Sequence, residues 1–187
     1  MEIEPLSTEL IERYLQSRQL RFFRSDDGEE FMVLSTYERG KLHVNLRING
    51  LRRDVLEISI SPAGYYHAAE RPRLMELVND WNRDTHWPKA FVRETAKPGH
   101  VSVVGENAYL LTDGIHIEAL GNFIRATVEY GADLFEKIER AVCLPSARVR
   151  TVDGPHRLGR DRVRLGIDGL FGRLPASLPA AQRFPGR

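Results

Sequence analysis

Residues 71–92 read RPRLMELVNDWNRDTHWPKAFV, and the change of periodicity inside this stretch decides the fold. The first half has apolar residues at the spacing of one helical face, namely Leu74, Leu77, Val78 and Trp81. Pro72 fits the first turn of such a helix, where a backbone N–H is not needed. Because Pro88 biases the residue before it towards extended geometry, we expect the helix to end by His86 and a strand to follow over Ala90–Glu94.

The residues before this stretch predict a helix and then an antiparallel meander. Helical spacing runs over Leu6–Leu20, with Ser7 or Thr8 as the N-terminal cap. Period-two or β-branched segments follow, with turns at Arg39-Gly40 and Asn49-Gly50; they span Phe31–Tyr37, Leu42–Ile48 and Val55–Ile60. Such close turns predict neighbouring antiparallel strands with one face on a core.

The residues after it predict a hairpin and a long helix. A second strand, Val101–Val104, follows the turn at Lys97-Pro98-Gly99, and Tyr109 to Leu111 either extend it or form a third strand. Helical spacing then runs from Ile117 to about Val142. Gly121 and Gly131 weaken a helix, so we expect close packing or a kink at those two positions.

Together these elements predict an α+β fold in the order α-β-β-β-α-β-β-α, with helices packed on an antiparallel sheet. Composition divides the 187 residues into a domain over 1–144 and an Arg/Pro/Gly-rich tail over 145–187. The tail has nine Arg, three Asp and no Lys or Glu, which makes its net charge +6 and leaves −5 for the domain. The density of Pro and Gly predicts that the tail is largely flexible.

The sequence lacks the common signatures of enzymes and metal sites. It has no HExxH, CxxC, GxSxG, GxxxxGK or GxGxxG motif, and we therefore expect no catalytic residue, metal or cofactor. Asp113, His116 and Glu118 are the best metal candidates, but a turn Asp that caps a helix beside solvated neighbours explains them better. Cys143, the only thiol, is interpreted as buried filler at a helix end.

Charge and hydropathy also limit the partners. The acidic domain disfavours nucleic acid, whereas the basic tail leaves that question open. No apolar run is long enough for a membrane span, and the acidic start does not resemble a signal peptide, so we expect a cytoplasmic protein. In the tail, basic and apolar residues alternate at Arg162, Val163, Arg164, Leu165 and Ile167. This pattern suits a strand that is added to a sheet edge, either of this protein or of a partner. Two alternatives remain open, namely a linker without a partner and a tail that lies on the acidic domain.

One resemblance is more specific than these patterns. A helix that ends in Leu77-Val78-Asn79-Asp80-Trp81-Asn82-Arg83, shortly before Trp87-Pro88-Lys89-Ala90-Phe91-Val92, resembles the YbjN family of bacterial sensory transduction regulators. Val103-Val104-Gly105-Glu106 and the later Asp113-Gly114 agree with it, and the likeness covers about residues 5–142. It implies a fold like that of the type III secretion chaperones, frequent homodimers, and no established enzymatic activity or cofactor.

Two functions remain open. The first is a non-enzymatic regulatory or chaperone-like module that acts as a homodimer and binds a client protein. The alternative is a small-molecule sensor with a pocket between the second helix and the sheet. The candidate surface for either is Asn79, Trp81, Asn82, Trp87 and Tyr65. Each of these residues also has a purely structural explanation. Trp81 would pack on the sheet, and Asn79 and Asn82 would satisfy backbone groups near the helix end. Tyr65 would belong to an exposed loop that runs to Glu70.

Overall fold

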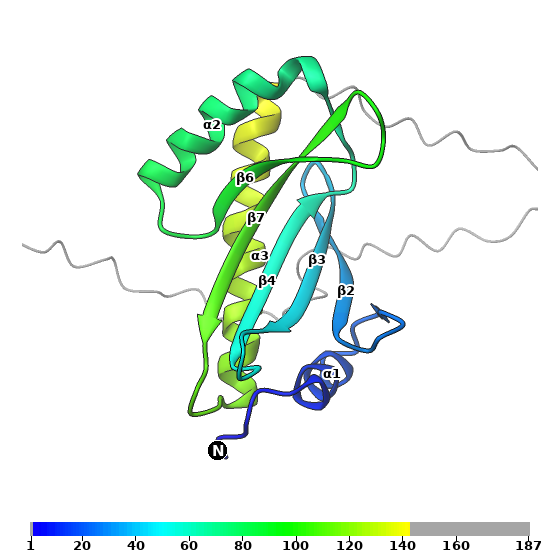
Figure 1. Ribbon diagram of the computed structural model, residues 1–187, viewed down its shortest axis with the longest axis vertical. Helices are drawn as coiled ribbons and strands as arrows, with labels where there is room; N and C mark the ends of the chain where they lie inside the picture. Colours follow the sequence, from blue (N-terminus) through cyan, green and yellow to red (C-terminus); the bar gives the residue numbers. More distant parts are fainter. Residues whose placement is uncertain (1, 143–187) are drawn as a thin grey trace, which may run out of the picture.

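The computed structural model describes residues 2–142 (Figure 1). The predictions for Cys143 and for the tail residues Arg162, Val163, Arg164, Leu165 and Ile167 lie outside the described residues. The elements, in chain order, are α1 (Thr8–Ser17), β1 (Phe22–Arg24), β2 (Glu30–Tyr37), β3 (Gly40–Asn49), β4 (Val55–Pro62), β5 (Tyr66–His67), the 3₁₀ turn η1 (Ala68–Glu70), α2 (Arg71–Asp84), β6 (Lys89–Glu94), β7 (His100–Leu110) and α3 (Ile117–Ala141).

All the strands belong to one antiparallel sheet. The path runs β1-β2-β3-β4-β7-β5, and β6 pairs with β7 outside this path. Residues 105–110 of β7 pair with β4, and residues 101–106 pair with β6 on the other side of the strand. The sheet therefore ends in β1 at one edge and in β6 at the other.

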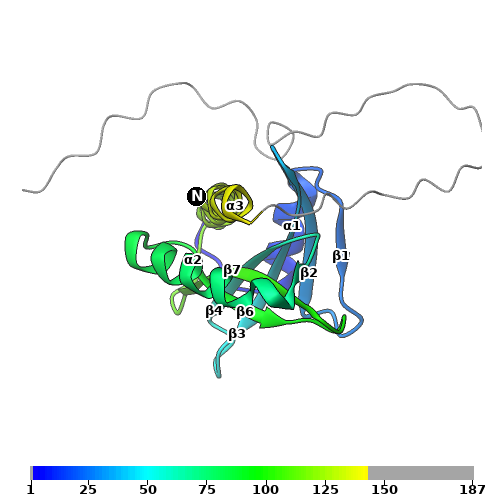
Figure 2. The same ribbon diagram turned by 90° about the horizontal axis from the view of Figure 1, so that it is seen from above.

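The helices pack on one side of this sheet. Figure 2 shows α3 and α1 on the same side of the curved sheet, where α3 contacts β4 and β7 and α1 contacts α3. Burial along β2, β3 and β4 alternates as the sequence predicts, so that Phe31, Val44 and Ile58 face the core while their neighbours do not. Helix α2 lies along β6, at the edge of the sheet (Figure 1).

Two helical glycines mark the closest approaches of the helices to their neighbours. A Cβ at Gly131 of α3 would overlap Cδ1 of Ile60 in β4. A Cβ at Gly121 would lie 2.6 Å from Cε2 of Tyr14 in α1. The prediction of close packing at these two positions is confirmed, and α3 continues as one helix from Ile117 to Ala141.

The structure confirms the α+β class and the expected order, with differences in detail. The side chain of Ser7 caps α1 by accepting a hydrogen bond from the Leu10 N–H, and the helix ends at Ser17. Tyr109 and Leu110 extend the second arm of the hairpin as part of β7. Strands β1 and β5 are additional, because three and two residues are too few to carry a readable period.

The prediction of an exposed loop from Tyr65 to Glu70 is wrong, because residues 66–67 form β5 and residues 68–70 form η1. Tyr66 is buried, with 1% of its surface exposed, because it pairs with Val101 of β7 and its ring enters the core. Tyr65 is half exposed, and His67 caps the 3₁₀ turn by accepting a hydrogen bond from the Ala69 N–H.

Candidate functional site

The segment from Trp81 to Ala90 fastens the end of α2 to the start of β6. Trp81 faces the core with 6% of its surface exposed, and its Nε1–H donates a hydrogen bond of 2.7 Å to the Pro88 carbonyl. The Nζ of Lys137, on α3, lies 6.0 Å from the centroid of the Trp81 ring. A buried indole needs a partner for its N–H, and the loop carbonyl provides it.

Asn82 binds the backbone of β6 with both ends of its side-chain amide. Its Nδ2 donates to the Ala90 carbonyl at 2.9 Å, and its Oδ1 accepts from the Ala90 N–H at 2.8 Å. A neighbouring strand would satisfy the same two groups with its own peptide units. The amide therefore takes the place of a strand at this one position of the sheet edge.

Lys89 completes the junction from the other direction. Its Nζ donates to the carbonyls of Asn82 and Thr85, each at 2.9 Å, at the C-terminal end of α2. A cation at this end of a helix is favourable, because the last carbonyls there have no partner within the helix. Trp87 makes no such contact and leaves 55% of its surface exposed.

The role of Asn82 also shows which backbone groups of β6 face away from β7. In an antiparallel pair, residues at alternate positions direct both their N–H and C=O groups to the same side. Ala90 directs its groups away from β7, so Val92, two residues later, does the same. The described residues supply no hydrogen-bond partner for the outward N–H and C=O of Val92. The edge of the sheet is open there.

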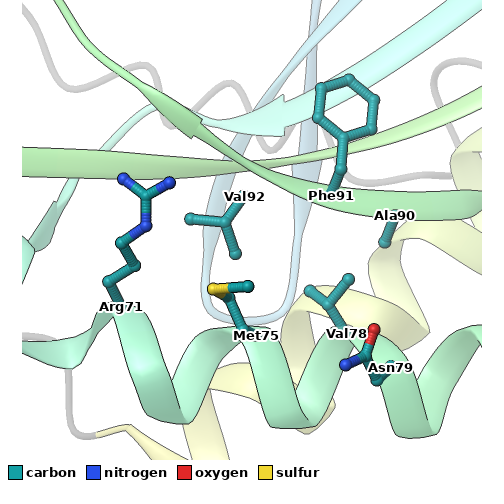
Figure 3. A pocket seen from close by; sticks show the side chains of 7 residues that line it. All are labelled: Arg71, Met75, Val78, Asn79, Ala90, Phe91 and Val92. Atoms are coloured by element: carbon teal, nitrogen blue, oxygen red, sulfur yellow. The ribbon is translucent and has the colours of Figure 1, made fainter.

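A groove of about 220 Å³ lies beside this open backbone, between α2 and β6. Figure 3 shows its lining: Arg71, Met75, Val78 and Asn79 from α2, and Ala90, Phe91 and Val92 from β6. The Ala90 and Val92 side chains point towards α2, whereas Phe91 points away from it (Figure 3). The floor of the groove is apolar, and Met75 is half exposed.

Polar contacts mark both ends of the groove. The Asn82 amide holds Ala90 at one end. At the other end, Arg71 of α2 makes an ion pair with Glu94 of β6, and both side chains are exposed. The open stretch of β6 therefore begins at Val92 and runs to the end of the strand at Glu94.

The five predicted surface residues are divided by the structure. The side chains of Trp81 and Asn82 are hydrogen-bonded to backbone groups of the loop and of β6, and only Asn79 lines the groove. Trp87 and Tyr65 are exposed outside it. Sequence reasoning did not name Met75 or Val92 as site residues; the available signal was the period of α2, which places Met75 one turn from Arg71 and from Asn79.

A second cluster of polar groups lies in the core. The Tyr37 hydroxyl donates to the Glu139 carboxylate of α3. Burial, followed by this hydrogen bond, raises the pKa of Tyr37, and burial, followed by the charge of Glu139, raises the pKa of Tyr66. The buried Tyr66 hydroxyl has no hydrogen-bond partner among the described residues. Both phenols are therefore neutral at physiological pH and do not act as bases.

The candidate metal ligands do not come together. His116 Nδ1 lies 2.8 Å from the Glu2 carbonyl oxygen, and Glu118 makes an ion pair of 3.0 Å with Arg18 of α1. Within residues 2–142, no three His, Cys, Asp or Glu side chains lie close enough together to hold a metal ion. No helix in the same range is long and apolar enough to cross a membrane.

Comparison with known proteins decides the family. The family model described as "YbjN: Putative bacterial sensory transduction regulator" matches residues 7–140. The chain belongs to the YbjN family. The match includes α1, the whole sheet, the junction at Trp81 to Ala90, and nearly all of α3.

The solved structure of an E. coli protein agrees on the fold. The crystal structure of YbjN from E. coli, which is described as a putative transcription regulator, has a TM-score of 0.60 and 12% sequence identity, and the match covers 75% of this chain and 95% of that one. An uncharacterized protein from Methanothermobacter thermautotrophicus matches with a TM-score of 0.46 and 13% identity, over 73% of this chain and 99% of that one. No curated protein matches the sequence. The family is described by a regulatory role and not by an enzymatic activity.

Proposed function

We propose that this YbjN protein is a non-enzymatic, chaperone-like regulatory module that binds a segment of another protein between α2 and β6. The observation that carries the proposal is the open backbone of Val92 beside an apolar groove. Unpaired strand edges are the usual sites of strand addition, in which main-chain hydrogen bonds give affinity and adjacent pockets give selectivity.

The size of the groove favours a protein segment over a small molecule. Its volume of about 220 Å³ is below the roughly 300–1,000 Å³ of typical small-molecule sites. Of its two polar lining side chains, Arg71 is paired with Glu94 and Asn79 is exposed. A metabolite sensor at this position is therefore the weaker alternative, and the experiment below tests it.

A homodimer is part of the same proposal. The face of the sheet turned away from the helices has exposed apolar side chains on three strands, Leu34 of β2, Phe91 of β6 and Leu110 of β7. A dimer interface over these side chains would remove apolar area from water. Sedimentation equilibrium of the full chain is expected to give twice the monomer mass, and a monomer at all concentrations would remove this part of the proposal.

Site-specific photo-crosslinking tests the binding function. A photoreactive residue in place of Met75, in the groove, is expected to form a covalent adduct with a protein of the native host. An excess of this protein without the photoreactive residue should reduce the yield of the adduct. The matched control is the same photoreactive residue at Leu51, which is fully exposed in the β3–β4 turn at the opposite end of the molecule (Figure 1). Equal adducts at both positions, together with a metabolite that raises the melting temperature, would favour the sensor instead.

A further inference from the structure

The open edge of β6 presents two chemically different faces to a strand beside it. On the side of α2 lie the Val92 side chain, which is half-buried, and Met75, which is 48% exposed. On the opposite face lie Phe91 and Arg93, whereas the Nζ of Lys89 turns back to the carbonyls at the end of α2. Successive side chains of an added strand would meet these two environments in turn.

On the face turned away from α2, the cation next to the open backbone is Arg93, while Glu106 of β7 lies on the same face opposite Lys89. Lys89 and Arg93 are both exposed, and Arg93 makes no ion pair among the described residues. Opposite charges next to each other on neighbouring strands are stabilising, and like charges are destabilising. An added strand is therefore favoured when its side chains on this face are acidic.

The face towards α2 requires apolar side chains. Met75, Val78 and Val92 line the groove there, and Val78 is buried at 4% exposure. A partner side chain that enters between Met75 and Val92 removes apolar surface from water on both molecules. Met adapts to partners of different shape because its side chain is unbranched and flexible.

The described contacts also limit the length of the added strand. Asn82 already occupies the Ala90 N–H and C=O, so pairing begins at Val92. The Arg71–Glu94 ion pair lies at the other end of the groove. The backbone of Val92 then provides one donor and one acceptor, and the chemistry of the neighbouring side chains determines selectivity.

We infer that the partner segment is a short extended strand in which apolar and acidic residues alternate, and that it pairs with the Val92 backbone. This inference rests on the proposed function and specifies its partner. The chain's own tail is a poorer occupant: Val163, Leu165 and Ile167 suit the groove, but its arginines, Arg162 and Arg164, would lie on the face of Arg93.

Fluorescence anisotropy on the full chain, with synthetic peptides as probes, tests the inference. The probes are labelled peptides with blocked ends in which Val alternates with Glu or with Lys over about nine residues, and a peptide with the sequence of residues 160–168. We expect the Val/Glu peptide to bind about tenfold more tightly than the Val/Lys peptide or the tail peptide. Equal affinities, or tighter binding of the tail peptide, would overturn the inference.

Two variants test the geometry. Val92→Pro removes the outward N–H and no hydrogen bond to β7, a change that edge strands tolerate, and is expected to abolish binding of the Val/Glu peptide. Val92→Ala, the matched control, keeps the N–H and is expected to retain most of the affinity. If the proline variant does not fold, Arg93→Glu serves instead, since it should lower the preference for Val/Glu over Val/Lys at least fivefold. Binding that neither Val92→Pro nor Arg93→Glu changes would show that the peptide lies elsewhere.

The two proposals fail in distinguishable ways. If Met75 crosslinks a host protein but the Val/Glu peptide does not bind, the partner chemistry is wrong and the binding function stands. If neither occurs, both are wrong.

Discussion

Replacing Asn82 with Ala is expected to destabilise the protein by about 2 kcal/mol. The side-chain amide makes two neutral hydrogen bonds to Ala90, at 2.8 and 2.9 Å, and each such bond contributes about 1 kcal/mol. For a domain of this size, that loss lowers the melting temperature by about 8 °C. Urea unfolding and thermal melts followed by circular dichroism measure both quantities.

Asn79→Ala is the matched control for this substitution. Asn79 lies three residues earlier in the same helix, is exposed, and makes no side-chain hydrogen bond among the described residues. Both substitutions change helix propensity equally, so Asn79→Ala should alter stability by less than about 0.5 kcal/mol. Asn82→Asp keeps the acceptor and loses the donor at neutral pH. Its loss of stability relative to the unchanged protein should be smaller at low pH, where a protonated carboxyl again donates to the Ala90 carbonyl.

Amide hydrogen exchange gives a direct test of the edge. The Ala90 N–H should be protected in the native protein and should lose that protection in Asn82→Ala, whereas the Val92 N–H should exchange rapidly in both. A loss of stability below about 0.5 kcal/mol in Asn82→Ala, or strong protection of Val92 in the free protein, would refute the reasoning.

Three further predictions concern the core and the sheet. Gly131→Ala should lower the free energy of unfolding by about 1–2 kcal/mol because the new Cβ overlaps Ile60, and the loss should be smaller in an Ile60→Val background. If urea unfolding shows that the losses of the two single variants simply add in the double variant, this reasoning is wrong. Trp81→Phe should lower the melting temperature, since it removes the indole N–H that holds the loop, and an unchanged melt would argue against that hydrogen bond. Burial, and then the charge of Glu57, raises the pKa of Glu106 above 4.5, so ionisation of this carboxyl opposes folding. Glu106→Gln should therefore stabilise the protein at pH 7.5 but not below pH 4.5, and urea unfolding at both pH values measures the difference.

Periodicity predicts the long elements of this fold well, and it fails where an element is too short to have a period. The meander, the hairpin and the three helices all carry at least two repeats of an apolar pattern, and each lies within a few residues of its predicted position. The short strand at Tyr66 carries none. A buried Tyr beside a Pro-Ala-Gly turn looks like a loop residue until the pairing with Val101 is known.

The predicted surface shares one residue, Asn79, with the groove, and its binding role stays a prediction. Of the residues that line the groove, the segment from Asn79 to Ala90 contains only these two, and the resemblance of this segment to the YbjN family drew attention to it. Two of its polar side chains, however, bind backbone groups up to eight residues away, and no periodic pattern encodes such a contact. The open Val92 backbone depends on strand order, which one sequence does not specify.

The Asn82 amide has a consequence beyond stability, because an exposed sheet edge can also recruit copies of itself. Long, flat edges allow open-ended growth of a sheet into fibres. Here one edge strand has only three residues, and the other is closed at Ala90 by a side chain of its own chain. What remains open is a few residues of β6 backbone, an edge too short to be a template for open-ended growth of a sheet.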